Sequence, residues 1–235
     1  MKSTENSNGR TAVVACQIME PELERIQRDS APVKIFYLEQ SLHRTPQKMA
    51  ARVQEQVDTA AAEADRIVLG YGLCSNGIVG VQAPRQGLIV PRCHDCIAFF
   101  LGSPEAYMAD FTARPGTYYL TPGWIAEKKD PLSIIEDDYI PRFGRETAEW
   151  VMQEELKHYT HIVLIDTGTA AIEPLRQRAQ ENARFFNMAY VEMQAQNLVY
   201  FDKLLHGPYD PEHFITLEPG DTIEQGRFLE CLEER

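Results

Sequence analysis

Short apolar runs alternate with longer amphipathic stretches along most of this chain. In the first half, the runs with strand character are rich in β-branched residues: Thr11–Cys16, Val33–Leu38, Arg66–Gly70 and Leu88–Pro91. Between them, apolar residues recur at helical spacing. This alternation predicts an α/β fold, with a mainly parallel sheet and helices on both of its faces.

The clearest helix is predicted from Pro46 to Ala64. Met49, Val53 and Val57 recur at helical spacing, Thr45 is suited to the N-cap, and proline is favoured at the first helical position. The helix should therefore bury one apolar stripe against the sheet.

The second half repeats the alternation after Arg114. Strands are predicted at Thr117–Leu120, His161–Ile165, Met188–Met193 and His213–Leu217. Helices are predicted from Ser103 towards Phe111, over Arg145–His158, after Gly168 through Phe186, and around Asn197–Leu205. Prolines at 122, 131 and 141 predict an irregular connection over Pro122–Gly144, which would cover a site or join two halves.

These elements predict a disordered lead over residues 1–10 and two α/β halves, 11–114 and 115–235, both possible Rossmann-like units. A single doubly wound sheet accounts for the same pattern. In either arrangement, the first half carries the chemistry described below.

Composition narrows the possible partners. The 235 residues carry a formal net charge of -12, which works against binding to nucleic-acid phosphates. No apolar run approaches the roughly 20 residues that cross a bilayer, and the polar N-terminus lacks a signal-peptide core. We therefore expect a cytoplasmic protein that binds neither nucleic acid nor membranes. In that reducing compartment, its five cysteines favour metal or thiol chemistry over disulfides.

Four cysteines fall at or just after predicted strands: Cys16, Cys74, Cys93 and Cys96. Because the carboxyl ends of parallel strands share one edge of a sheet, these thiols should converge. His94, within the Cys93–Cys96 segment, and His43, after the second strand, are expected at the same edge. Thiolates and imidazole suit zinc, and thiolates also hold iron–sulfur clusters.

Each candidate ligand also has a simpler interpretation. Cys93 and Cys96 could form a redox pair or be two small buried thiols, and Cys16 alone would be a core residue. His43 alone would be a solvated loop residue. Their shared position at the sheet edge favours a metal site.

A glycine-rich loop surrounds Cys74. Gly70, Gly72 and Gly77 would let the backbone approach a bound group, and Asn76 lies in the same turn, so we expect these residues to bind a cofactor. A plain turn is the alternative. Asp166, at the end of a strand in the second half, would either orient a ligand or accept backbone hydrogen bonds in a turn.

The ordered motifs resemble an uncharacterised domain family, DUF1638. The resemblance rests on Ala15–Cys16, Leu42-His43-x-x-Pro46, Gly70–Gly77, Arg92–Ile97, Leu101–Ser103, Pro115–Thr117, Thr121–Trp124 and Leu204–Gly207 followed by Phe214. It implies functional roles for Cys16, His43, Cys74, His94 and Cys96, whereas Cys93 departs from the pattern. Genes of this family often lie beside corrinoid-dependent methyltransferases, which implies one-carbon metabolism.

The leading expectation is a Zn or iron–sulfur protein, acting as a metal-dependent methyl-transfer enzyme or as an accessory. Its partners would be a small molecule or a corrinoid methyltransferase system, with corrinoid as a further possible cofactor and a homo-oligomer as a possible assembly. Two alternatives stand beside it. One is a metal-independent cysteine acid/base enzyme of the aspartate/glutamate racemase type, and the other is a non-enzymatic corrinoid or metal accessory.

Overall fold

The computed structural model describes residues 9–28, 30–195 and 197–229. Nearly all of the predicted lead, and Cys231, lie outside these residues. Contacts divide the chain into two units. The first contains Met1–Cys16, Gln27–Cys96 and Asp202–Arg235, and the second contains Gln17–Ile26 and Ile97–Phe201. The predicted halves, 11–114 and 115–235, are continuous stretches of sequence. Each of the two units, in contrast, combines segments that are distant in sequence.

The first unit is built on a five-stranded sheet of order β2-β1-β3-β4-β8. Its strands are β1 (Thr11–Cys16), β2 (Lys34–Leu38), β3 (Arg66–Gly70), β4 (Leu88–Pro91) and β8 (Phe214–Leu217). The first four run parallel and β8 is antiparallel to β4. Strand β1, which lies between β2 and β3, is buried from Ala12 to Cys16, as expected of a strand covered on both faces. The predicted α/β class and mainly parallel sheet are confirmed.

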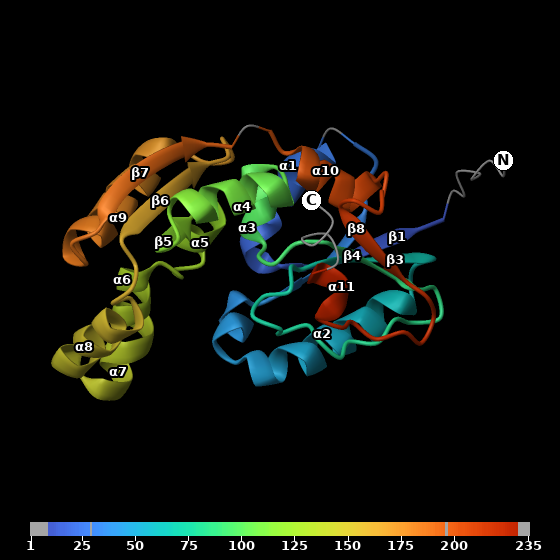
Figure 1. The fold of residues 1–235 in the computed structure, drawn as a ribbon, viewed down its shortest axis with the longest axis horizontal. Helices are drawn as coiled ribbons and strands as arrows, with labels where there is room; N and C mark the ends of the chain where they lie inside the picture. The colour runs from blue at the N-terminus through green and yellow to red at the C-terminus, as the bar shows by residue number, and fades with distance from the viewer. Residues whose placement is uncertain (1–8, 29, 196, 230–235) are drawn as a thin grey trace. The chain divides into compact units, whose positions relative to one another are not determined.

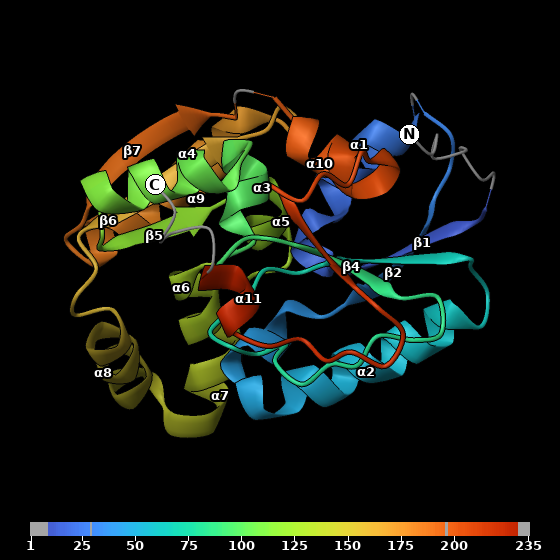
Figure 2. The ribbon, with the colours of Figure 1, turned by 45° about the vertical axis from the view of Figure 1, so that its right-hand side comes forward.

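Helices lie on both sides of this sheet, with α2 (Pro46–Ala61) on one side and the end of α10 (Val199–His206) on the other (Figures 1 and 2). Met49, Val53 and Val57 are fully buried, as the helical spacing predicts. Thr45 occupies the N-cap position, but its side chain makes no capping hydrogen bond. A 3-10 turn, η2 (Gln40–Arg44), and a short helix, α11 (Gly226–Leu229), complete the described elements of this unit.

The second unit contains a parallel sheet of order β5-β6-β7: β5 (Thr117–Leu120), β6 (His161–Asp166) and β7 (Ala189–Gln194). Helix α9 (Ile172–Phe185) packs on β6 and β7 (Figure 2). The remaining elements here include η1 (Gln17–Met19), α1 (Glu20–Arg28), α3 (Ile97–Leu101), α4 (Pro104–Ala113) and α8 (Arg145–Glu155). Ser103 caps α4 as predicted, because its Oγ accepts a hydrogen bond from Ala106 N at 3.1 Å.

The prediction of an irregular connection over Pro122–Gly144 is wrong. This segment forms α5 (Pro122–Ala126), α6 (Pro131–Ser133), a π-helical turn η3 (Ile134–Tyr139) and α7 (Ile140–Phe143). Each proline stands in the first turn of a helix, where its missing N–H is not needed. Ile134, Ile135 and Tyr139 are buried against α8 residues, so packing stabilises these short helices.

None of the helices within the described part of the chain is both long and apolar enough to cross a membrane.

Candidate functional site

Three parallel strands bring the candidate thiols to one edge of the first sheet. β1 ends at Cys16, β3 ends four residues before Cys74, and β4 ends shortly before Cys93 and Cys96. The 3-10 turn η2, which follows β2, brings His43 to the same edge, where its Nε2 lies 3.8 Å from Cys16 Sγ. Parallel pairing therefore collects side chains that are distant in sequence.

The loops after β3 and β4 are fastened to each other by backbone hydrogen bonds. Leu73 N donates to Cys93 O at 2.9 Å, and Cys74 N donates to His94 O at 3.0 Å. A methyl group at Gly72 would lie 2.9 Å from the carbonyl carbon of Asp95, so only glycine allows this approach. The positions of Cys74 and Cys96 are thereby coupled.

Cys74 begins a turn of left-handed backbone. The φ angles of Cys74, Ser75 and Asn76 are 48°, 55° and 67°. Residues other than glycine rarely adopt this region of φ. Gly77 N closes the turn by donating to Cys74 O at 3.0 Å. Strain of this kind, on the order of 1–3 kcal/mol per residue, persists only where the surroundings hold it, and it clusters at functional sites.

His43 links two of the thiols. Burial lowers the pKa of its imidazole, but hydrogen bonds with Cys16 and Cys74, together with the charges of those sulfurs, outweigh burial and raise the pKa to about 11. At neutral pH the ring is therefore an imidazolium, held against sulfur atoms.

Cys74 and Cys96 form the second contact within the cluster. The hydrogen bond from Cys96 lowers the pKa of Cys74 to about 6, against burial and with the help of His43. The same bond and burial raise the pKa of Cys96 well above its ordinary value. The hydrogen bond between the two sulfurs therefore favours the thiolate on Cys74 and the thiol on Cys96.

Tyr71 is a member of the cluster that the sequence did not reveal. Its side chain is fully buried and its ring stacks on His43, with centroids 6.1 Å apart. Burial, and then the charges of Cys16 and Cys74, raise the pKa of its hydroxyl well above the ordinary value, so it stays protonated. Within the described residues this hydroxyl has no hydrogen-bond partner, which costs about 1–3 kcal/mol. In the sequence, the feature that could have singled out Tyr71 is its position between Gly70 and Gly72.

The other predicted site residues have separate positions. Cys93 is buried, and within the described residues the half-buried His94 ring has no hydrogen-bond partner. Gly70 packs against β1, since a methyl group there would lie 2.9 Å from Ala15 Cβ. Asp166 belongs to the second unit, where its carboxylate accepts hydrogen bonds from Gly168 N at 2.8 Å and Gln194 Nε2 at 2.7 Å. Those bonds match the turn interpretation of Asp166.

The donor set fits a thiophilic metal, although the donors are more widely spread than in a loaded shell. Zinc lies about 2.3 Å from sulfur and about 2.0 Å from nitrogen, so neighbouring donors in a tetrahedral shell are roughly 3.5 Å apart. The 3.8 Å between Cys16 and His43 is close to that value. Among the described residues, no three of these donors have atoms all within 4.8 Å of one another. Metal binding would therefore require cysteine side chains to rotate inward.

Comparison with known proteins agrees with the motifs. The model of a protein family of unknown function, DUF1638, matches residues 37–205. The chain is a member of the DUF1638 family. No curated protein and no solved structure matches it. The matched part of this DUF1638 chain includes His43, Tyr71, Cys74 and Cys96, whereas Cys16 precedes it.

A second group of possible ligands in this DUF1638 protein lies near β8. Asp210, Glu212 and His213 have ligand atoms within 4.8 Å of one another. Lys203 Nζ, however, lies 3.1 Å from Asp210 Oδ2 and 3.3 Å from His213 Nδ1. The ammonium group already supplies positive charge here, so we assign no metal to this group.

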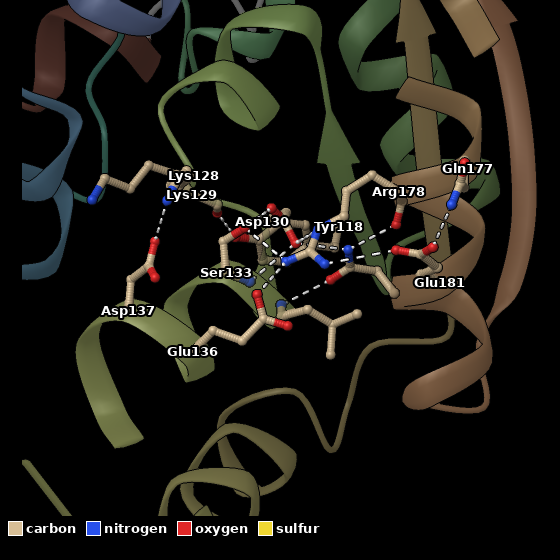
Figure 3. Close-up of polar contacts among 12 residues, drawn as sticks. Tyr118, Lys128, Lys129, Asp130, Ser133, Glu136, Asp137, Gln177, Arg178 and Glu181 are labelled. Atoms are coloured by element: carbon tan, nitrogen blue, oxygen red, sulfur yellow. Dashed lines mark hydrogen bonds and ion pairs between the residues drawn. The ribbon is translucent and has the colours of Figure 1, made fainter. Parts of the chain in front are cut away.

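The second unit has a buried polar network around Asp130 and Arg178 (Figure 3). The fully buried Asp130 carboxylate accepts hydrogen bonds from Arg178 Nε at 2.9 Å and from Asn182 Nδ2 at 2.8 Å. Ser133 N donates to it as well, at 3.2 Å. The network connects the start of α6 to α9, and its groups are occupied by one another, which makes its role structural.

Glu22 is a second buried carboxyl group among the described residues of the second unit. Its Oε1 accepts hydrogen bonds from Thr167 Oγ1 at 2.5 Å and Thr169 Oγ1 at 3.2 Å. Its Oε2 is buried and has no partner within the described residues. Burial raises the pKa of Glu22 to about 7, because a charged carboxylate is poorly solvated here.

Proposed function

We propose that this protein binds a metal ion through Cys16, His43, Cys74 and Cys96, with zinc as the leading candidate. One observation carries the proposal: three cysteines and a histidine from four separate segments lie in one cluster, in which His43 contacts Cys16 and Cys74, and Cys74 contacts Cys96. Thiolates and imidazole are the donors that zinc prefers. A divalent cation would replace the protons that these groups now share, and would compensate the buried negative charge of the sulfurs.

The fit is chemical as well as spatial. The site holds four potential donors, and the loops that carry Cys74 and Cys96 are fixed by backbone hydrogen bonds. A strained turn and an unpartnered buried hydroxyl lie in the same place. A structure that tolerates several such costs at one position supports a binding role there.

The test is metal analysis of full-length protein purified without oxygen. We expect close to one equivalent of zinc per chain, and less than about half an equivalent of any metal would overturn the proposal. Zinc gives a colourless protein, whereas an iron–sulfur cluster absorbs visible light and contains acid-labile sulfide. The latter result would keep the site and replace the metal.

Metal-free thiol chemistry is the second candidate, and the Cys74–His43 pair favours it. A thiolate beside an imidazolium is the arrangement of an activated cysteine nucleophile or base. Cys74 and Cys96 touch each other, so they do not flank a substrate carbon as two thiols of a racemase would. Exchange of solvent deuterium into aspartate or glutamate by chelator-treated protein, lost in Cys74→Ser, would support this candidate.

The link to methyl-transfer metabolism, as an enzyme or as an accessory, is a further part of the proposal. It rests on the gene neighbourhood implied by the family. Titration of the purified protein with cobalamin, followed by its visible spectrum, tests corrinoid binding. An unchanged spectrum, together with no retention of a corrinoid methyltransferase in a pull-down, would remove this part and leave the metal site intact.

A further inference from the structure

The unpartnered hydroxyl of Tyr71 points to a ligand that the protein side chains do not supply. Tyr71 follows β3 directly, and both neighbouring glycines are in close contact with other segments. A methyl group at Gly70 would lie 2.9 Å from Ala15 Cβ. One at Gly72 would lie 2.9 Å from the carbonyl carbon of Asp95. The backbone of Tyr71 is therefore held between two tight contacts.

The ring of Tyr71 is also fixed. It stacks on His43 with an interplanar angle of 19°, and its side chain is fully buried. A buried hydroxyl normally has a hydrogen-bond partner, and this one has none among the described residues. A neutral phenol donates one hydrogen bond through its O–H, and an acceptor atom would satisfy that donor.

We propose that Tyr71 donates a hydrogen bond to an exchangeable ligand of the metal: a water or hydroxide, or the anion that replaces it. This inference rests on the proposed metal site. It deepens that proposal by making the shell an open one: three of the four protein donors hold the metal at a time, and the exchangeable ligand takes the remaining position, which a closed shell does not have. Tyr71 is then a positioning residue for that ligand.

A different acceptor is the Cys16 sulfur, which acts on the Tyr71 hydroxyl through its charge and through a hydrogen-bonding contribution, although the two atoms do not meet the geometry of a hydrogen bond. In that case Tyr71 would support a protein ligand and leave no role for an exchangeable one. The two arrangements differ in what removal of the hydroxyl weakens: ligand binding in the first, metal binding in the second.

The experiment uses the full chain loaded with Co²⁺ and titrated with azide. Thiolate-to-cobalt charge-transfer bands report metal binding, and the d–d bands report the number and type of ligands. Wild type, Tyr71→Phe and Tyr209→Phe are compared. Tyr209 lies in the same unit but donates to the carbonyl groups of Leu204 and Leu205, both at 3.3 Å, which makes it a matched control.

We expect azide to shift the d–d bands of wild type and of Tyr209→Phe in a saturable way. Tyr71→Phe should keep its charge-transfer bands and bind azide about three- to tenfold more weakly, as expected for one lost hydrogen bond. The melting temperature of metal-free Tyr71→Phe should not fall, because the hydroxyl it lacks has no partner there. A marked fall would show that the hydroxyl has a protein partner and would overturn the inference.

The remaining outcomes separate the two proposals. Absence of charge-transfer bands in wild type overturns the metal site and this inference together. With bands present, absence of an azide shift in wild type, or equal azide affinity in Tyr71→Phe, overturns only the inference. Weaker cobalt binding with unchanged azide affinity assigns the hydroxyl to Cys16 and overturns it too.

Discussion

The imidazole of His43 lies 3.8 Å from the sulfur of Cys16, although 27 positions separate the two residues. The half-buried His94 ring, two residues from Cys96 in sequence, has no hydrogen-bond partner within the described part of the chain. Proximity along the chain is thus a poor guide to which histidine serves the cluster.

The two histidines should therefore differ in their effect on metal binding. We expect His43→Gln to weaken zinc binding by at least about 100-fold, and His94→Gln to change it by less than about twofold. Competition with a chromophoric chelator measures both. The opposite order would replace His43 by His94 as the ligand.

Cys93 and Cys96 provide a matched pair of substitutions. Both are 2% exposed, so serine at either position places a similar hydroxyl in a similar environment. Cys96 forms a hydrogen bond with Cys74, and we expect Cys96→Ser to lose most of the zinc while Cys93→Ser keeps it. Metal analysis beside a thermal melt checks this, and equal losses would argue that the effect is general destabilisation.

Gly72 should tolerate no side chain. Alanine there would press against the Asp95 backbone, and we expect about 1–3 kcal/mol of lost stability together with weaker metal binding. Gly226→Ala is the control, because a methyl group at Gly226 meets nothing within 4 Å. Urea denaturation measures both, and equal stabilities would show that the two loops can separate freely.

Stability should depend on pH through Glu22. Its pKa is raised from 4.5 to about 7 in the folded protein, so the folded state binds more protons than the unfolded state between these values. The stabilisation is fully present below pH 4.5 and is lost as pH rises through 7, by at most about 3 kcal/mol. Glu22→Gln should remove this loss and be more stable than wild type at pH 8. Parallel pH–stability curves for the two proteins would contradict the assignment.

The Asp130–Arg178 network should be sensitive to a neutral replacement. Asp130→Asn leaves the Arg178 guanidinium without its buried carboxylate and should cost about 3 kcal/mol or more. Asp137, whose ion pair with Lys128 is exposed (Figure 3), is the control, and Asp137→Asn should cost less than about 1 kcal/mol. Urea denaturation measures the free energy of unfolding of both variants. Equal losses would contradict a larger contribution from the buried network.

The strands could be predicted because their local patterns agree with the fold. Thr11–Cys16, Arg66–Gly70, Leu88–Pro91 and Thr117–Leu120 have the predicted boundaries. Each is a short, mostly apolar run that contains β-branched or aromatic residues and lies between turn or helix signals. Parallel pairing of the first three then places Cys16, Cys74 and Cys96 at one edge, as the sequence led us to expect.

The remaining features depend on tertiary structure. The turn after β2 determines which histidine reaches the thiols, and its path is set by packing that no local pattern encodes. Tyr71 resembles any buried aromatic in sequence, since only the structure shows that its hydroxyl lacks a partner. The Pro122–Gly144 segment was misjudged because proline both interrupts helices and begins them.

Strand β8 has a consequence for synthesis of the chain. It covers the outer edge of β4, yet it lies far towards the C-terminus, in Phe214–Leu217. A ribosome therefore releases β1 to β4, with every residue of the thiol cluster, long before the strand that protects their edge. During that interval β4 presents free backbone groups to other chains. Truncation before Phe214 should accordingly yield nascent or recombinant protein that aggregates, even though it retains every proposed ligand.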